Sequence, residues 1–176
     1  MTGPVLIVFG GLPGVGKSAI AAEVSRRLNA AYLRIDVIEL AMSRALGIPK
    51  ERDIGPAGYV VAYGLARSNL GLGVSVVADS VNPITATRKA WRAVAADAHT
   101  ACLEVEVVCS NRATHRRRVE ARIGDPAAMQ PPTWVEIETR TYEPWPQAQL
   151  RIDTADMAVQ ASAALVCNAA ARLVEA

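Results

Sequence analysis

The stretch Gly11-Leu12-Pro13-Gly14-Val15-Gly16-Lys17-Ser18 decides the fold of this 176-residue chain. It fits the phosphate-loop pattern G-x-x-x-x-G-K-S/T without a mismatch. The glycines let the backbone curl so that successive N–H groups point at phosphate oxygens, and the following helix N-terminus adds partial positive charge. In such a loop Lys17 reaches the β- and γ-phosphates, and the Ser18 hydroxyl ligates Mg²⁺. The stretch Gly11–Ser18 therefore predicts a site for ATP and Mg²⁺.

The residues on either side place this loop between a strand and a helix. Val5–Phe9 is an uninterrupted apolar run, as expected of a strand buried on both faces. Ser18–Leu28 carries apolar residues at helical spacing. This is the context that a phosphate loop requires, whereas the alternative is a plain glycine turn that enters a helix.

Short apolar runs and longer amphipathic ones alternate through the rest of the chain. Further strands are predicted at Tyr32–Ile35, Val74–Ala78, Leu103–Val108 and Leu150–Ile152. Further helices are predicted at Val37–Leu46, Pro56–Leu70, Pro83–His99, Ala113–Ile123, Thr133–Tyr142 and Asp156–Val174. In the helix at 56–70 we expect an inward face of Val60, Val61, Gly64 and Leu65. The alternation indicates βαβ units, hence an α/β fold with a parallel sheet covered on both faces, in a single domain over residues 1–176.

Composition excludes several classes of protein. Hydrophobic residues make up 51% and charged residues 20%, which argues against intrinsic disorder, and the net charge of +2 argues against a nucleic-acid binder that works by bulk charge. Three cysteines without CxxC spacing argue against a disulfide framework and a zinc site. We see no targeting or membrane segment, so we expect a soluble cytoplasmic protein with no membrane partner.

Two acids stand at predicted strand ends, where ligands gather in a parallel sheet. Asp36 could accept the proton of an acceptor hydroxyl and orient it for in-line attack, or it could cap a helix. Asp79 could hold the hydration shell of Mg²⁺. Alternatively, Asp79 could cap the helix that begins at Pro83, or could itself be the base.

Residues 112–122 hold five arginines against one acid. For Arg116 and Arg117 we favour a solvated helix face. Arg118 and Arg122 lie one turn apart beside a Gly/Pro-rich segment that could hinge, so they are candidate lid arginines that close over nucleotide phosphates. The predicted lid spans about residues 112–132. Contact with nucleic acid through the same arginines is less favoured, because interleaved aromatics are lacking.

The motifs narrow the class of P-loop protein. The sequence has no Asn-Lys-x-Asp guanine-reading motif and no hydrophobic run that ends in Asp-Glu, as motor ATPases often have. A small phosphotransferase is the class that remains.

At these residues the sequence resembles the AAA_33-type P-loop kinases, a group similar to polynucleotide kinase, zeta toxin, chloramphenicol phosphotransferase, and gluconate or shikimate kinases. The resemblance rests on Gly11–Ser18, Asp36, the run 78–83 (Ala-Asp-Ser-Val-Asn-Pro) and the pair Arg118/Arg122. It implies a three-layer P-loop sandwich with a five-stranded parallel sheet in order 2-3-1-4-5 and a small helical lid. It also implies a catalytic base at Asp36, a supporting role for Asp79, and lid arginines at Arg118 and Arg122.

One departure bears on the phosphoryl acceptor. Polynucleotide kinases carry Asp-x-x-Arg at the base, but Glu39 stands three residues after Asp36 here. The run 36–42 is closer to the D-S-x-x-E-A of chloramphenicol phosphotransferases, which favours a neutral or cationic small-molecule hydroxyl.

We therefore predict ATP- and Mg²⁺-dependent transfer of the γ-phosphoryl group to such a hydroxyl. The alternatives are a polynucleotide 5′-hydroxyl kinase and a nucleotide-binding switch without an acceptor. Candidate acceptor-pocket residues are Tyr59, Tyr63, Asn82 and Arg88.

Overall fold

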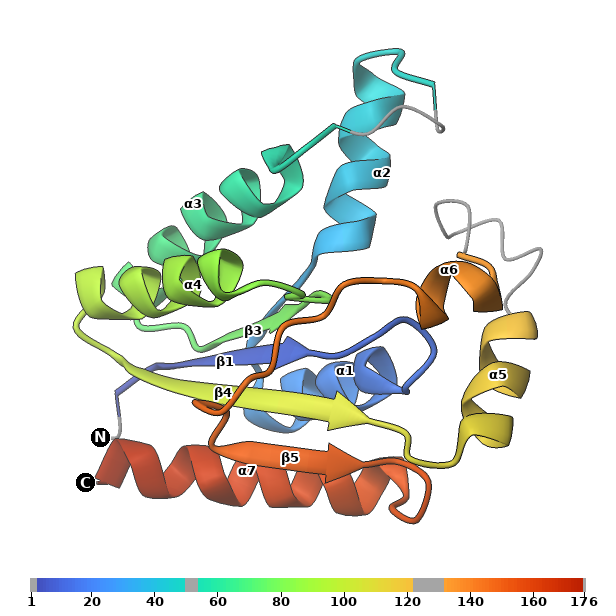
Figure 1. Cartoon of the computed structure of the whole chain (residues 1–176). Coiled ribbons are helices and arrows are strands. Elements are labelled where there is room, and N and C mark those ends of the chain that lie inside the picture. Colours follow the sequence, from blue (N-terminus) through green and yellow to red (C-terminus); the bar gives the residue numbers. More distant parts are fainter. Residues whose placement is uncertain (1–2, 50–53, 122–131, 176) are drawn as a thin grey trace.

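Five strands form one parallel sheet in the order β2-β3-β1-β4-β5 (Figure 1). The structure, a computed structural model, describes residues 3–49, 54–121 and 132–175. The strands are β1 Val5–Gly10, β2 Ala31–Arg34, β3 Val76–Asp79, β4 Ala101–Val108 and β5 Leu150–Asp153. Both the predicted α/β P-loop fold and the order 2-3-1-4-5 that the resemblance implied are confirmed.

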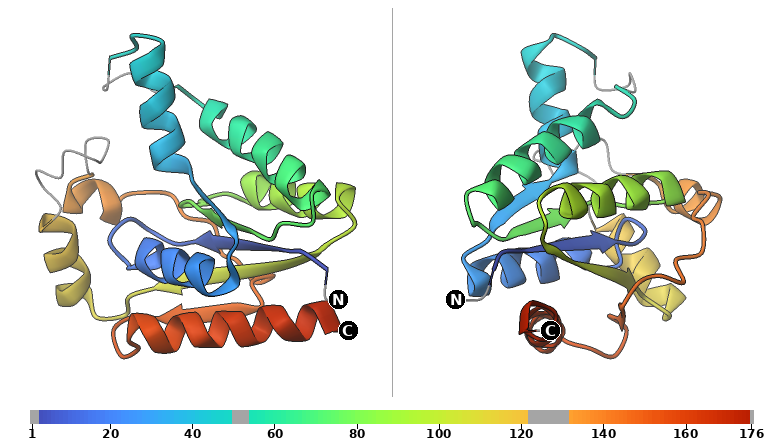
Figure 2. Two further views of the ribbon diagram at one scale, coloured as in Figure 1. Left: turned by 180° about the vertical axis from the view of Figure 1, so that it is seen from behind. Right: turned by 90° about the vertical axis from the view of Figure 1, so that its left-hand side faces the viewer.

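Helices cover both faces of this sheet (Figure 2). They are α1 Lys17–Leu28, α2 Ile35–Ala45, α3 Ala57–Gly71, α4 Thr85–Asp97, α5 Arg112–Glu120, α6 Trp134–Glu138 and α7 Val159–Glu175. The central strand β1 is buried on both sides: Ile7 and Phe9 pack in the cluster with α1 and α7, while Leu6 and Val8 pack with α3 and α4. This alternation explains why the sequence of β1 is apolar throughout.

Within the three described ranges no helix combines the length and the apolar character that crossing a bilayer requires.

The inward face predicted for α3 is wrong. Val60, Val61 and Leu65 are exposed, at 61%, 39% and 43% of their full surface, whereas Ala62 and Ala66 are completely buried. Both sets recur at helical spacing, so periodicity could not choose between them. The small side chains of the alanines let α3 approach the sheet closely, in the same cluster as Leu6, Val8 and Trp91. The larger aliphatic residues are left on the outside.

The helix after the predicted lid is also shorter than expected. The helix predicted at Thr133–Tyr142 is α6, which ends at Glu138. At its start, Thr133 is the N-cap and forms a capping box with Glu136. From residue 139 the chain runs without regular structure toward β5 (Figure 1). Residues 122–131, which include part of the predicted lid, lie outside the described residues.

Candidate active site

The phosphate loop connects β1 to α1 at the carboxyl edge of the sheet (Figure 1). Its backbone conformation favours glycine at Gly14 and Gly16, where φ is +86° and +96°. Gly16 is the N-cap of α1, so the first N–H groups of that helix face the loop. The Lys17 side chain is buried. These features give the loop the curled backbone and the positive helix end that bind phosphate.

A cavity of about 300 Å³ opens at this loop. Its lining is made by residues of the loop, of α1 and of α5: Gly14, Gly16, Lys17, Ser18, Ala19, Arg118 and Ala121. The structure thus places Arg118 beside the phosphate loop, and its role as a lid arginine stays a prediction. Arg122, its proposed partner, lies outside the described residues.

Arg118 is fixed by contacts with the connection between β5 and α7. Its Nη1 donates a hydrogen bond to Thr154 Oγ1 at 2.8 Å, and its Nη2 donates to the Thr154 carbonyl at 3.1 Å. Nη1 also donates to Cys109 Sγ at 3.7 Å. Arg118 is therefore anchored next to the cavity before any ligand contacts it.

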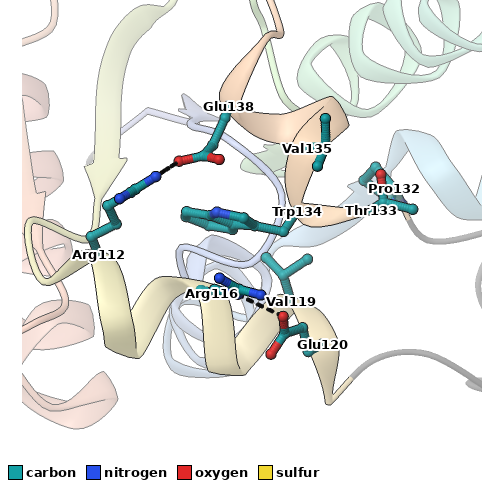
Figure 3. Close-up of a pocket in the computed structure, with 9 residues that line it drawn as sticks. All are labelled: Arg112, Arg116, Val119, Glu120, Pro132, Thr133, Trp134, Val135 and Glu138. Carbon is teal, nitrogen blue, oxygen red and sulfur yellow. Dashed lines mark hydrogen bonds and ion pairs between the residues drawn. The ribbon is translucent and has the colours of Figure 1, made fainter.

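The other arginines of α5 are exposed, and Figure 3 shows two of them paired with acids. Arg116 Nε donates to Glu120 Oε1 at 2.7 Å, and Arg112 Nε donates to Glu138 Oε1 of α6 at 2.9 Å. Arg117 is exposed as well, so the expectation for Arg116 and Arg117 is confirmed. The pocket of about 410 Å³ between α5 and α6 is consequently lined by arginines that are already paired with acids.

Asp79 is the last residue of β3 and is almost completely enclosed, with 1% of its surface exposed. Tyr32 of β2 donates its hydroxyl to Asp79 Oδ2 at 2.7 Å. Burial and the neighbouring carboxylate raise the pKa of Tyr32 well above its usual range, so the hydroxyl keeps its proton. Among the described residues Asp79 Oδ1 is buried without a hydrogen-bond partner. The side chain therefore has one oxygen held and one available.

Asp36 lies in the first turn of α2 and is half-exposed. The N-cap of α2 is Arg34, without a side-chain cap, so Asp36 does not fill the capping role left open above. Asp79 does not cap α4 either, since the N-cap there is Ile84. The Arg34 guanidinium instead joins the two acids: its Nη2 lies 3.5 Å from Asp36 Oδ2 and its Nε 3.9 Å from Asp79 Oδ2.

Two of the proposed acceptor-pocket residues are structural. Arg88 is buried, and its three nitrogens donate to the carbonyls of Asn82, Pro144 and Glu143 at 2.7–2.9 Å. The Asn82 amide in turn donates to the Phe9 carbonyl at 2.8 Å. These bonds tie the start of α4 to the end of β1 and to the segment that follows α6. Arg88 and Asn82 therefore hold the backbone around the site.

The two tyrosines have different surroundings. Tyr59 Oη accepts the Asn82 backbone N–H at 3.3 Å, and burial raises the pKa of its hydroxyl. Glu39 and Asp36 are near enough to contribute to this rise. Tyr63 donates to the Thr87 carbonyl at 3.3 Å and packs edge-on against Trp91. Of the four acceptor candidates, Tyr59 is the one that the structure brings near Asp36.

Comparison with known proteins agrees with this architecture. The sequence profile of the AAA_33 family, described as an AAA domain, matches residues 6–136. The chain belongs to the AAA_33 family. No significant match is found among curated proteins.

Solved structures share the fold of this AAA_33 protein. A candidate kinase from Chloroflexus aurantiacus has a TM-score of 0.78 at 20% identity, over 98% of this chain and 99% of its own. The APS kinase of Mycobacterium tuberculosis, in complex with AMPPNP and APS, has a TM-score of 0.70 at 20% identity over 100% of both chains. A gluconokinase from Sinorhizobium meliloti has a TM-score of 0.65 at 18% identity, over 99% of this chain and 96% of its own.

Sequence reasoning missed four side chains around the site of this AAA_33 protein: Tyr32, Arg34, His115 and Thr154. Tyr32 and Arg34 had a usable signal, since alternate residues of a strand share a face and β2 leads directly into Asp36. His115 stands inside the arginine-rich run, where it reads as one more polar surface residue. Thr154 follows a short strand and carries no pattern of its own. The fold alone brings these last two side chains to the phosphate loop.

Proposed function

We propose that this AAA_33 protein is an ATP- and Mg²⁺-dependent phosphotransferase, which moves the γ-phosphoryl group to a hydroxyl of a small molecule in the cytoplasm. The observation that carries the proposal is the phosphate loop with Asp79, Arg34 and Asp36 at the same sheet edge. The fold shared with an APS kinase bound to AMPPNP and with a gluconokinase supports it. In this proposal the chain acts as one domain, and α5 belongs to its lid.

The phosphate loop would hold the triphosphate. Inward N–H groups and the start of α1 bind phosphate oxygens, and Lys17 bridges the β- and γ-phosphates. Arg118 would add positive charge from the other wall of the cavity, together with Arg122 of the predicted lid.

The residues present fit Mg²⁺. This ion prefers oxygen ligands and keeps several waters, and the Asp79 carboxylate and Ser18 hydroxyl supply such oxygens. The buried Asp79 Oδ1, which lacks a partner among the described residues, is the atom we assign to the ion or its water. When bound, Mg²⁺ neutralises the charge that develops on the phosphate oxygens.

Asp36 would orient the acceptor and take its proton. Its half-exposed carboxylate can be reached by a substrate hydroxyl, whereas Asp79 is enclosed. Arg34, beside both acids, keeps Asp36 directed toward the site. Glu39 adds negative charge near Tyr59, and this favours a neutral or cationic acceptor.

The test is transfer of label from γ-labelled ATP to a panel of sugars, antibiotics, nucleosides and 5′-hydroxyl oligonucleotides. A labelled small molecule supports the proposal, and Lys17→Ala should abolish the transfer while Arg117→Ala, on the exposed face of α5, should preserve it. A labelled oligonucleotide would show a polynucleotide kinase. Free phosphate alone, with ATP bound, would favour the nucleotide-dependent switch.

A further inference from the structure

Two carbonyls of the phosphate loop are held from outside the loop by buried side chains. His115 of α5 places Nε2 2.8 Å from the Pro13 carbonyl oxygen. Thr154, just after β5, places Oγ1 2.7 Å from the Val15 carbonyl oxygen. Both side chains are buried, at 6% and 7% exposure. A carbonyl only accepts, so the His115 nitrogen and the Thr154 hydroxyl are the donors.

Peptide geometry links these carbonyls to the phosphate-binding groups. In a trans peptide the C=O of one residue and the N–H of the next point in opposite directions, and the described residues contain no cis peptide. When Pro13 C=O is held toward His115, Gly14 N–H points away from His115. In the same way, holding Val15 C=O toward Thr154 turns Gly16 N–H away from Thr154. Gly14 and Gly16 are both lining residues of the cavity at the loop.

Each donor is itself fixed in direction. Arg118 Nη1 donates to Thr154 Oγ1, and a guanidinium cannot accept, so the Thr154 proton remains for a carbonyl. Val15 O at 2.7 Å is nearer to that hydroxyl than Val108 O at 3.2 Å. The His115 ring packs edge-on against Trp134, with 5.1 Å between ring centres. Neither donor needs a ligand to adopt its orientation.

We propose that His115 and Thr154 are positioning residues, which orient the Gly14 and Gly16 N–H groups for the phosphates of the nucleotide. The inference rests on the proposed function, because it assumes that the loop binds phosphate. Donors that are already oriented bind an anion without a cost of reorganisation. The two side chains therefore act on phosphate affinity through the backbone and do not touch the ligand.

Paired variants separate the hydrogen bond from packing. His115→Gln places an amide nitrogen where Nε2 stands, whereas the shorter His115→Asn does not reach the Pro13 carbonyl. Thr154→Ser keeps the hydroxyl, and Thr154→Val keeps the shape without it. Arg117→Ala, on the exposed side of α5, is the control. The probes are tripolyphosphate and Mg·ATP, measured by titration calorimetry, with the thermal midpoint of the unliganded protein recorded for each variant.

We expect His115→Asn and Thr154→Val each to weaken tripolyphosphate binding by about three- to tenfold, the usual weight of one hydrogen bond. His115→Gln, Thr154→Ser and Arg117→Ala should stay within about twofold of the wild type. The positioning role would be overturned if the two variants at each position bound tripolyphosphate as tightly as the wild type. It would also be overturned if both variants at each position lost the same affinity. Should His115→Asn fail to fold, the Thr154 pair decides. A wild-type protein that binds neither probe would instead overturn the proposed function itself.

Discussion

A methyl group added at Gly14 should cost clearly more stability than the same group added at Gly16. Both residues have a strongly positive φ, +86° and +96°, so the backbone strain from a Cβ is similar in the two, about 1–3 kcal/mol each. The surroundings differ. A Cβ at Gly14 would lie 2.5 Å from Val119 Cγ2, while at Gly16 the nearest atom is Thr154 Cγ2 at an ordinary 3.5 Å.

The difference between the two variants therefore measures how tightly α5 packs on the phosphate loop. Val119 is buried at 3% exposure and cannot simply swing into solvent. Overpacking of this kind costs about 1–3 kcal/mol, so Gly14→Ala should be destabilised by that much beyond Gly16→Ala. For a chain of this size the extra cost lowers the thermal midpoint by about 2–12 °C.

Urea unfolding of the wild type and four variants provides the assay: Gly14→Ala, Gly16→Ala, Val119→Ala and the double variant Gly14→Ala/Val119→Ala. Shortening Val119 makes room for the new methyl group. Val119→Ala should therefore lower the free energy of unfolding by at least about 0.5 kcal/mol less in the Gly14→Ala background than in the wild type. Equal free energies of unfolding for the two glycine variants, together with an additive double variant, would refute the packing of α5 on Gly14.

Two further predictions concern the site and the sheet. Asp36→Asn should leave ATP affinity unchanged but lower turnover by about 10²–10⁴, the usual effect of losing a positioned base; unchanged turnover in a label-transfer assay would remove Asp36 from the reaction. Burial raises the pKa of Cys102 to about 12, so at pH 8 the thiolate fraction is only about 10⁻⁴ and the folded protein should react slowly with iodoacetamide at this residue. Mass spectrometry of the Cys102 peptide checks this, and a rate equal to that in urea would contradict the burial.

Much of the architecture could be predicted because local signals and the fold agree. The phosphate loop, the buried strand before it and Asp79 at the end of β3 each follow from residue type and spacing. Asp36, predicted at a strand end, lies instead in the first turn of α2. The inward face of α3 could not be chosen, because an alanine stripe and a valine–leucine stripe have the same period. The two stripes differ in how closely they let α3 pack against Trp91 and β1, and this depends on the tertiary structure.

The contacts that hold the loop were hidden for a different reason. His115 and Thr154 lie 102 and 139 residues from the loop carbonyls that they bind. Neither residue type is diagnostic at its position, so only the topology of the sheet reveals the pairing. Arg88 is a candidate acceptor-pocket residue by sequence, but in the structure its guanidinium nitrogens donate to backbone carbonyls.

Arg34 makes the two acids of the site one electrostatic unit. Two carboxylates and one guanidinium meet there, and their formal charges sum to minus one when both acids are ionised. If either acid is neutralised, the shared cation turns fully to the other, so the effects of Asp36 and Asp79 variants will not add. If Arg34 is removed, two negative groups face each other with less compensation, which strengthens the pull on a divalent cation. Under the proposed function, the acceptor at Asp36 and the Mg²⁺ at Asp79 would therefore be coupled through Arg34.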